Sequence, residues 1–284
     1  MLNYCHYQKN NIIGRSILEN PPVADVFICG SDQIWNFTLV EDPTYFLDFT
    51  KNMQNVKKIA YAPSIADPWK ESSHNASRAY LKNLDFISVR EESDIAIVQQ
   101  LSEKKVEHVL DPVFLNTKEF WSNRTEKPKI KGEYILCYFL SVTSLAVETV
   151  RKIKELTGLP IVYINLNTLD KFNSDFDIRT ANPLEFIGYI ENATYVCTNS
   201  FYCSAFSVIF NKNYCVVPKS LSNERMISLQ SMFKIGNRII DKNLLQNLTV
   251  ADLKTDYSEY ENIKDQLVEK SRFFLKESIF KGEK

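Results

Sequence analysis

The chain has 284 residues, of which 44% are hydrophobic and 24% charged, a composition typical of a globular protein with one large domain or two smaller ones. Its 34 basic and 35 acidic residues give a formal net charge of −1, and without a basic excess nucleic acid is a poor candidate partner. No apolar run approaches the roughly 20 residues that span a bilayer, and residues 1–11 lack the pattern of a secretion signal. We therefore expect a cytoplasmic protein without an integral membrane segment.

Short β-branched runs alternate along the chain with amphipathic stretches. The expected strands are residues 25–29, 58–61, 86–89, 107–110, 134–139, 160–164, 195–197 and 214–217. The expected helices are residues 91–101, 144–156, 183–190, 200–210 and 224–233, with a long helix over 257–279. This alternation predicts an α/β fold of parallel sheets joined by crossover helices.

A charged stretch without apolar periodicity, residues 123–132, is the predicted domain boundary. We expect an N-terminal Rossmann-like domain over residues 1–125 and a C-terminal Rossmann-like domain over 126–256. Residues 257–284 would form a helix that packs back on the protein. The alternative is that 123–132 is a surface loop inside one domain.

Cysteine and histidine offer no metal site. The six cysteines include no CxxC pair, and the three histidines form no HxxxH or HExxH group. Cys29, Cys137, Cys197 and Cys215 lie in apolar strand-like runs, where a thiol behaves as a small core residue. The chain also lacks GxGxxG and GxxxxGK[ST], so nicotinamide and P-loop nucleotide sites have no support. We expect neither a metal nor a cofactor.

Two polar segments follow expected strands in the first half of the chain. In the first, Gly30 permits close approach to a ligand, while Ser31, Asp32 and Gln33 form a polar cluster. The alternative, which turn chemistry alone favours, is a purely structural role for Ser31 or Asp32 as the N-cap of a helix.

In the second segment, Arg90 ends a strand and could clamp a phosphate or carboxylate, with Glu91 beside it. An ordinary Arg–Glu surface pair is the alternative. The Asp111-Pro112 segment is better interpreted as a turn with a structural role, which ends the preceding strand.

The segment Asn199-Ser200-Phe201-Tyr202-Cys203 joins a buried strand to an uncharged helix. Free N–H groups at such a helix start suit an anion, and Ser200 is the expected cap. Cys203 could have a lowered pKa there, although no histidine nearby in sequence would activate it as a nucleophile. The alternative is a capped core helix. Arg225, further along, could reach a cleft or be a solvated first-turn residue.

Eight segments in order resemble the polysaccharide pyruvyl transferase family. They are GSDQIWN (30–36), YFLDF (45–49), KKIAYAPS (57–64), ISVREE (87–92), VLDPVFL (109–115), YILCYFL (134–140), NATYVCTNSF with FSVIFNKNY (192–214) and NER (223–225). The resemblance implies two Rossmann-like domains arranged as in glycosyltransferase-B enzymes. It also implies transfer of pyruvate from phosphoenolpyruvate to a saccharide or lipid-linked sugar acceptor, as a ketal in surface polysaccharide. Family members usually carry an earlier βα unit, so an incomplete N-terminal domain is one interpretation.

The resemblance also implies roles for individual residues. Arg90 and Arg225 would hold the anionic donor, the N–H groups around 200–203 would take its phosphate, and Asp32 would orient or deprotonate the acceptor. The family commonly has histidine and glycine where this chain has Tyr202 and Cys203. Tyrosine, with a reference pKa of about 10, is a poor proton shuttle at neutral pH. Two alternatives therefore stay open: a catalytically impaired relative that binds a sugar or partner protein, and a nucleotide-sugar glycosyltransferase of similar fold.

Overall fold

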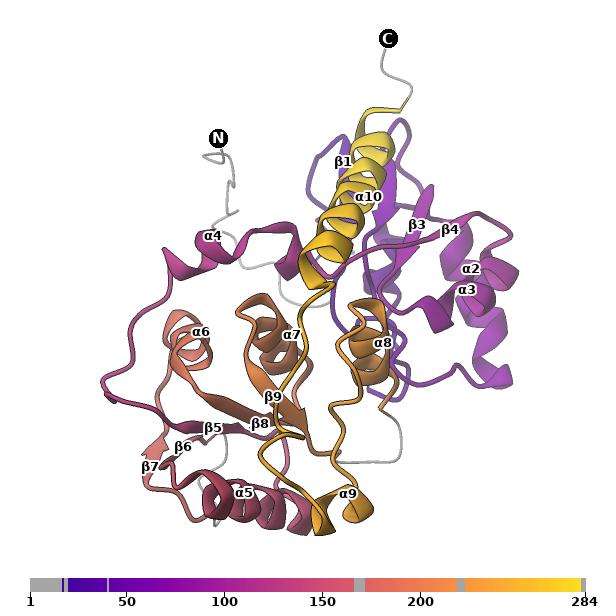
Figure 1. The fold of residues 1–284 in the computed structure, drawn as a ribbon. Helices are drawn as coiled ribbons and strands as arrows, with labels where there is room; N and C mark the ends of the chain where they lie inside the picture. The colour runs from indigo at the N-terminus through magenta and orange to yellow at the C-terminus, as the bar shows by residue number, and fades with distance from the viewer. Residues whose placement is uncertain (1–16, 18–19, 40, 166–171, 219–222, 282–284) are drawn as a thin grey trace. The chain divides into compact units, whose positions relative to one another are not determined.

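The computed structural model describes residues 17, 20–39, 41–165, 172–218 and 223–281. The chain divides into two compact units. The N-terminal unit comprises Met1–Arg90, Asp94–His108 and Phe274–Lys284, and the C-terminal unit comprises Glu91–Ser93 and Val109–Phe273. Each unit is an α/β structure around one parallel sheet, so the predicted fold class is confirmed (Figure 1).

The sheet of the N-terminal unit has four parallel strands in the order β1-β2-β3-β4. These are β1 (Val26–Cys29), β2 (Lys57–Ala60), β3 (Phe86–Val89) and β4 (Val106–His108). Its helices are α2 (His74–Lys82) and α3 (Ile95–Ser102), with short 3-10 turns η1 (Pro43–Phe46), η2 (Asp48–Thr50), η3 (Glu71–Ser73) and η4 (Glu92–Asp94). Apolar side chains from alternate strand positions, such as Phe27 and Cys29, pack with Leu81 of α2 and Val98 of α3 in one core.

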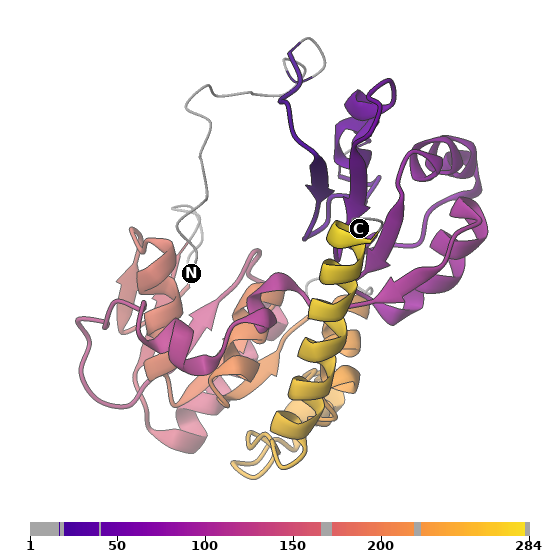
Figure 2. The ribbon, with the colours of Figure 1, turned by 90° about the horizontal axis from the view of Figure 1, so that it is seen from above.

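The end of the long helix α10 (Tyr260–Phe280) also belongs to this unit. Its Phe274 ring lies 6.3 Å from the Tyr61 ring, and Lys57 Nζ donates to the carbonyl oxygen of Ile279. Within the N-terminal unit, the purple helices and the yellow end of α10 therefore cover opposite faces of the sheet (Figure 2). The N-terminal unit is thus completed by the last part of the chain.

The sheet of the C-terminal unit has five parallel strands in the order β7-β6-β5-β8-β9. These are β5 (Ile135–Tyr138), β6 (Ile161–Ile164), β7 (Phe176–Ile178), β8 (Tyr195–Thr198) and β9 (Asn213–Val216). One face carries α5 (Ser144–Thr157) and α9 (Lys242–Gln246), and the other carries α6 (Pro183–Asn192), α7 (Phe201–Ile209) and α8 (Glu224–Met232) (Figure 1). The turn η5 (Pro112–Leu115) and α4 (Lys118–Ser122) come before the sheet. Two apolar cores result, one on each face.

All eight expected strands are present, with ends that differ by a residue or two. Four cysteines expected in strand cores, Cys29, Cys137, Cys197 and Cys215, are buried there. Strand β7, whose side chains are mostly exposed, was not predicted, and neither were the helices α2, α4 and α9.

One expected local structure is wrong. No helix begins at Ser31 or Asp32, because residues 31–39 form turns and a short bridge instead. The Ser31 hydroxyl donates to the carbonyl oxygen of Ala62 at 2.8 Å, so it is used across two loops and not as a helix cap.

The main division between the two units falls between His108 and Val109, whereas the predicted domain boundary lies after residue 125. The charged stretch lies against α6 of the C-terminal unit. Glu126 N donates to the carbonyl oxygen of Leu184 at 3.3 Å, and a side chain at Gly188 would come within 2.0 Å of the Glu126 oxygen. Asp111 is structural, as expected: its carboxylate accepts from Val113 N at the start of η5.

Candidate functional site

In the N-terminal unit, Asp32 and Arg90 meet at the carboxyl edge of the sheet. Arg90 Nη1 lies 3.8 Å from Asp32 Oδ1. The two side chains differ sharply in exposure, with 51% of the Asp32 side chain open to solvent and only 2% of Arg90. A carboxylate is thus presented to solvent with a buried guanidinium behind it, at the edge where open α/β sheets bind ligands.

The loop that carries Asp32 is fastened to the loop after β2. Asp32 has a left-handed φ of 67°, and its carbonyl oxygen accepts from Ser64 N at 2.9 Å. Ser64 in turn accepts from Trp35 N at 3.3 Å. Gly30 has a φ of +128°, and a Cβ there would lie 1.8 Å from the Tyr61 carbonyl oxygen. Glycine is therefore required for the two loops to approach this closely.

Aromatic rings pack against the same loop. Trp35 is fully buried and stacks on Phe46 with ring centroids 4.9 Å apart. Trp69 Nε1 donates to the carbonyl oxygen of Trp35 at 2.7 Å, and Phe37 stacks on Trp69 at 5.2 Å. The loop that carries the polar residues 31–33 is thus held by packed aromatic rings.

Arg90 is held through its backbone as well. Its N–H donates to Pro63 O at 3.2 Å, and its carbonyl oxygen is 3.0 Å from His108 Nε2. The buried Ser88 hydroxyl accepts from Ala62 N and donates to Ala60 O, which holds the end of β2. Ser88 was not predicted as a support, because a serine in a strand is ordinary and carries no signal of this role.

The remaining predicted residues of this region have different surroundings. Gln33 Oε1 accepts from Asn36 Nδ2 at 2.9 Å, so its amide helps to shape the loop. Glu91, like Arg90, is only 2% exposed, so neither residue lies at the surface. Gly30, Ser31, Asp32, Gln33 and Arg90 are together at one edge of one sheet.

In the C-terminal unit, the Asn199 side chain joins two loops. Its Oδ1 accepts from Leu140 N at 2.7 Å, and its Nδ2 donates to Ser141 O at 2.9 Å. The amide therefore fixes the loop after β5 to the start of α7. Substrate binding by this side chain would have to compete with both bonds.

Ser200 caps α7, as the sequence predicted. Its backbone is extended and its hydroxyl accepts from Cys203 N at 3.4 Å. Ser200 N donates to Thr198 Oγ1 at 3.0 Å. The start of α7 is thus capped by side chains of its own turn.

The expectation of a lowered pKa at Cys203 is wrong. The thiol is fully buried, and this burial raises its pKa to about 12. The desolvation of a thiolate outweighs any benefit from the helix start. Cys203 belongs to the apolar core, whereas Tyr202 is half-buried at its margin, with its ring 5.5 Å from Phe201. Arg225 lies half-buried in the first turn of α8.

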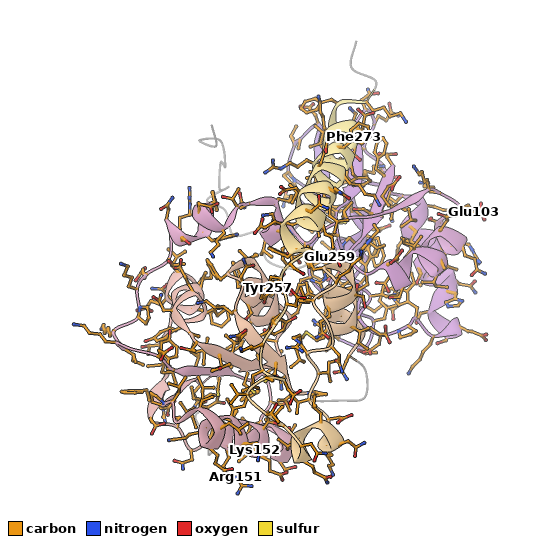
Figure 3. The ribbon with its side chains drawn as sticks, viewed as in Figure 1. Glu103, Arg151, Lys152, Tyr257, Glu259 and Phe273 are labelled. Carbon is orange, nitrogen blue, oxygen red and sulfur yellow. The ribbon has the colours of Figure 1, made fainter. Side chains whose placement is uncertain are left out.

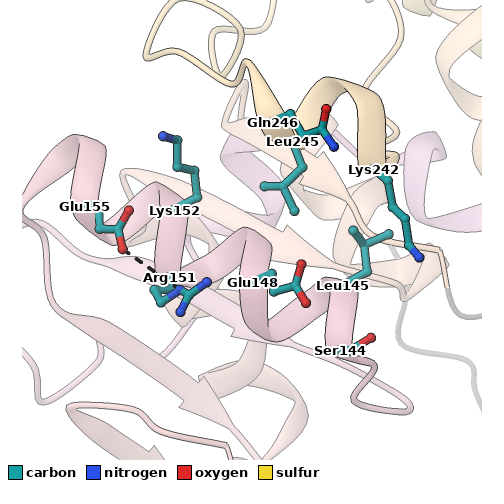
Figure 4. Close-up of a pocket in the computed structure, with 9 residues that line it drawn as sticks. All are labelled: Ser144, Leu145, Glu148, Arg151, Lys152, Glu155, Lys242, Leu245 and Gln246. Atoms are coloured by element: carbon teal, nitrogen blue, oxygen red, sulfur yellow. Dashed lines mark ion pairs between the residues drawn. The ribbon is translucent and has the colours of Figure 1, made fainter.

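A hollow of about 360 Å³ lies on the C-terminal unit between α5 and α9 (Figure 4). Charged side chains such as Glu148, Lys152 and Lys242 line it, with Leu145 and Leu245. None of the predicted site residues contributes to it. In the described part of the chain, no three His, Cys, Asp or Glu side chains are grouped to hold a metal ion. The helices described there include none long and apolar enough to cross a membrane.

Comparison with solved structures defines the class of fold. The chain is similar to UDP-GlcNAc 2-epimerase from Methanocaldococcus jannaschii, with a TM-score of 0.51, 12% identity, and coverage of 90% of this chain and 79% of that chain. It is also similar to UDP-N-acetylglucosamine 2-epimerase from Rickettsia bellii, with a TM-score of 0.52, 10% identity, and coverage of 93% and 76%. At these identities the likeness concerns the fold alone, which is of the glycosyltransferase-B type.

The family model for polysaccharide pyruvyl transferase matches residues 2–218, which is most of the chain. The protein therefore belongs to the polysaccharide pyruvyl transferase family. Comparison with curated protein sequences found no match.

Proposed function

We propose that the protein transfers pyruvate from phosphoenolpyruvate to two hydroxyls of a sugar. In this reaction the methylene carbon of the enol gains a proton and becomes a methyl group. Both sugar oxygens bond to the adjacent carbon, the bond from that carbon to the phosphate oxygen breaks, and phosphate leaves. The two hydroxyl protons balance the one gained by carbon and the one carried by phosphate.

The family match and the exposed Asp32 carboxylate at the sheet edge carry this proposal. The reaction needs a base or hydrogen-bond acceptor for the attacking hydroxyl, and a carboxylate in a fixed loop suits that role. Because Arg90 is buried, we infer that it holds Asp32 in place and does not contact the donor directly. Arg225 and the start of α7 are the proposed donor-binding elements.

We expect Asp32→Asn to lower phosphate release from phosphoenolpyruvate by about 100-fold or more, because removal of a general base costs 10²–10⁴ in rate. Release would be measured with a panel of sugar acceptors. Asp48→Asn is the matched control, since Asp48 is a carboxylate of the same unit that pairs with Lys51 at 3.3 Å. Arg90→Lys keeps the charge and should retain part of the activity.

A thermal-shift titration with phosphoenolpyruvate separates binding from chemistry, since a ligand of the native state raises the melting temperature. Asp32→Asn should still respond to phosphoenolpyruvate. Unchanged turnover in Asp32→Asn would falsify the role of the carboxylate. A response to UDP-GlcNAc and none to phosphoenolpyruvate would favour a nucleotide-sugar enzyme instead.

Tyr202 favours a second candidate, a relative that binds a sugar or partner protein but catalyses poorly. The family resemblance implies a histidine where this chain has Tyr202. Since Cys203 points into the apolar core, its replacement of glycine adds no side chain at a solvent-exposed position. Tyr202→His is therefore the informative variant. A gain of phosphate release in Tyr202→His over an inactive wild-type protein would support this candidate.

A further inference from the structure

Ala62, in the loop after β2, has a backbone conformation that its residue type does not favour. Its φ of 53° is left-handed, where a Cβ is unfavourable, and the residue is fully buried. In the same unit a left-handed φ has an ordinary explanation at Glu103, an exposed residue (Figure 3) that ends α3 with its N–H on the Gln99 carbonyl oxygen. Ala62 ends no helix, so its own contacts must hold its conformation.

Two serine hydroxyls make these contacts. Ala62 N donates to the Ser88 hydroxyl at 3.1 Å, and the Ala62 carbonyl oxygen accepts from the Ser31 hydroxyl at 2.8 Å. Ser88 is fully buried on β3, and its hydroxyl is oriented because it donates to Ala60 O at 2.9 Å. Both polar backbone groups of Ala62 are therefore bonded to side chains, one from β3 and one from the loop that carries Asp32.

The next two residues continue this connection. Pro63 O accepts from Arg90 N at 3.2 Å, and Ser64 N donates to Asp32 O at 2.9 Å. Residues 62–64, which we call the 62–64 linker, thus bond the end of β3 on one side and the Asp32 loop on the other. The separation of 3.8 Å between Asp32 Oδ1 and Arg90 Nη1 therefore depends on where this linker lies.

We propose that Ser88 is a positioning residue for the pair formed by Asp32 and Arg90. Without the Ser88 hydroxyl, Ala62 loses the acceptor for its N–H and relaxes from the left-handed toward the extended conformation. This change displaces the rest of the 62–64 linker, to which both members of the pair are bonded. Because Ser88 is fully buried, it acts through Ala62 and not on a substrate. The inference rests on the proposed function, since Asp32 is the proposed base.

Ser88→Ala tests the proposal in two assays. In hydrogen exchange, Ser64 N–H should exchange faster, because the displaced linker no longer holds it on Asp32 O. In phosphate release from phosphoenolpyruvate, kcat should fall on the order of tenfold or more, since a small displacement of a reacting group costs rate. KM for phosphoenolpyruvate should stay unchanged, because the proposed donor-binding residue Arg225 belongs to the other unit.

Ala62→Gly separates the conformation of the linker from the stability of the fold. Glycine adopts a left-handed φ without strain, so the linker should keep its course in the double variant Ser88→Ala with Ala62→Gly. We expect its kcat to return most of the way to that of Ala62→Gly alone. Its melting temperature should stay low, because the N–H of residue 62 has still lost its acceptor.

Ser77→Ala is the matched control, because Ser77 is a fully buried serine of the same unit whose hydroxyl donates to Ser73 O at 2.9 Å. It should lower the melting temperature and leave both kcat and exchange at Ser64 unchanged. Unchanged exchange or unchanged kcat in Ser88→Ala, an equal fall of kcat in Ser77→Ala, or no recovery in the double variant overturns the proposal. A wild-type protein that releases no phosphate would refute the proposed function instead, and hydrogen exchange would still decide whether Ser88 holds the Asp32 loop.

Discussion

At the scale of single residues, Cys203 shows how burial overrides position. A cysteine near a helix N-terminus is commonly activated, yet here the thiol has no solvent around it and its pKa is raised to about 12. Cys29 is affected in the same way, with its pKa raised to about 12 by burial. At neutral pH a thiol of pKa 12 is ionised in only about one molecule in 10⁵.

We therefore expect iodoacetamide to leave all five described cysteines, 29, 137, 197, 203 and 215, unmodified in the native protein. In denaturant, where the burial is lost, all five should react. Mass spectrometry of peptides from both samples checks this. Rapid native alkylation at Cys203 would show an exposed thiolate and contradict the structural assignment.

Gly30 is the residue on which the geometry of the Asp32 loop most depends. Gly30→Ala adds a Cβ 1.8 Å from the Tyr61 carbonyl oxygen at a φ of +128°. We expect a loss of about 2 kcal/mol or more in the free energy of unfolding, because backbone must shift on both loops.

Gly132→Ala is the control for this prediction. Gly132 also has a positive φ, +92°, but its Cβ would meet nothing within 4 Å. Its cost should be limited to the left-handed conformation, about 1–2 kcal/mol. Urea denaturation compares the two variants. If they lose equal stability, the close approach at Gly30 is not what demands glycine.

At the scale of elements, Asn199 links the start of α7 to the loop that leads from β5 to α5. Asn199→Ala removes the acceptor for Leu140 N and the donor to Ser141 O. We expect a loss of about 1–3 kcal/mol in stability, since backbone groups lose their partners. Hydrogen exchange at Leu140 should accelerate, whereas exchange in β6 should not. Intact protection at Leu140 would mean that water replaces the side chain without cost.

Sequence patterns predict some of the secondary-structure elements and fail to predict others. Strands such as β5 and β6 are continuously apolar because helices cover both faces of their sheet, and the sequence predicted them. The edge strand β7 has the pattern Phe-Asp-Ile with exposed side chains, and nothing local distinguishes it from a loop. Ser31 and Asp32 have the residue types of a helix cap, yet their partners lie 31 residues or more away in sequence.

At the scale of the whole molecule, the N-terminal unit is assembled from three segments, and the last is the end of α10. Truncation after Phe273 would remove the contacts of Phe274 with Tyr61 and of Lys281 with the Phe86 ring. We expect this truncation to destabilise the N-terminal unit selectively, because apolar area on one face of its sheet becomes exposed. Hydrogen exchange should rise in β1–β4 and stay unchanged in β5–β9. Equal acceleration in both sheets would show that α10 stabilises the C-terminal unit as much.

The sequence by itself determined the α/β class, eight of the nine strands in the described part of the chain and the family, because apolar periodicity and short motifs are local properties of the chain. Through the family resemblance it also named Asp32, Tyr202 and Arg90 as catalytic residues, which stays a prediction. Only the tertiary structure decided that Asp32 is exposed and Arg90 buried, that Asn199 is a structural link and that Cys203 belongs to the core. Burial and long-range hydrogen bonds depend on segments far apart in sequence, so the order of residues alone does not reveal them.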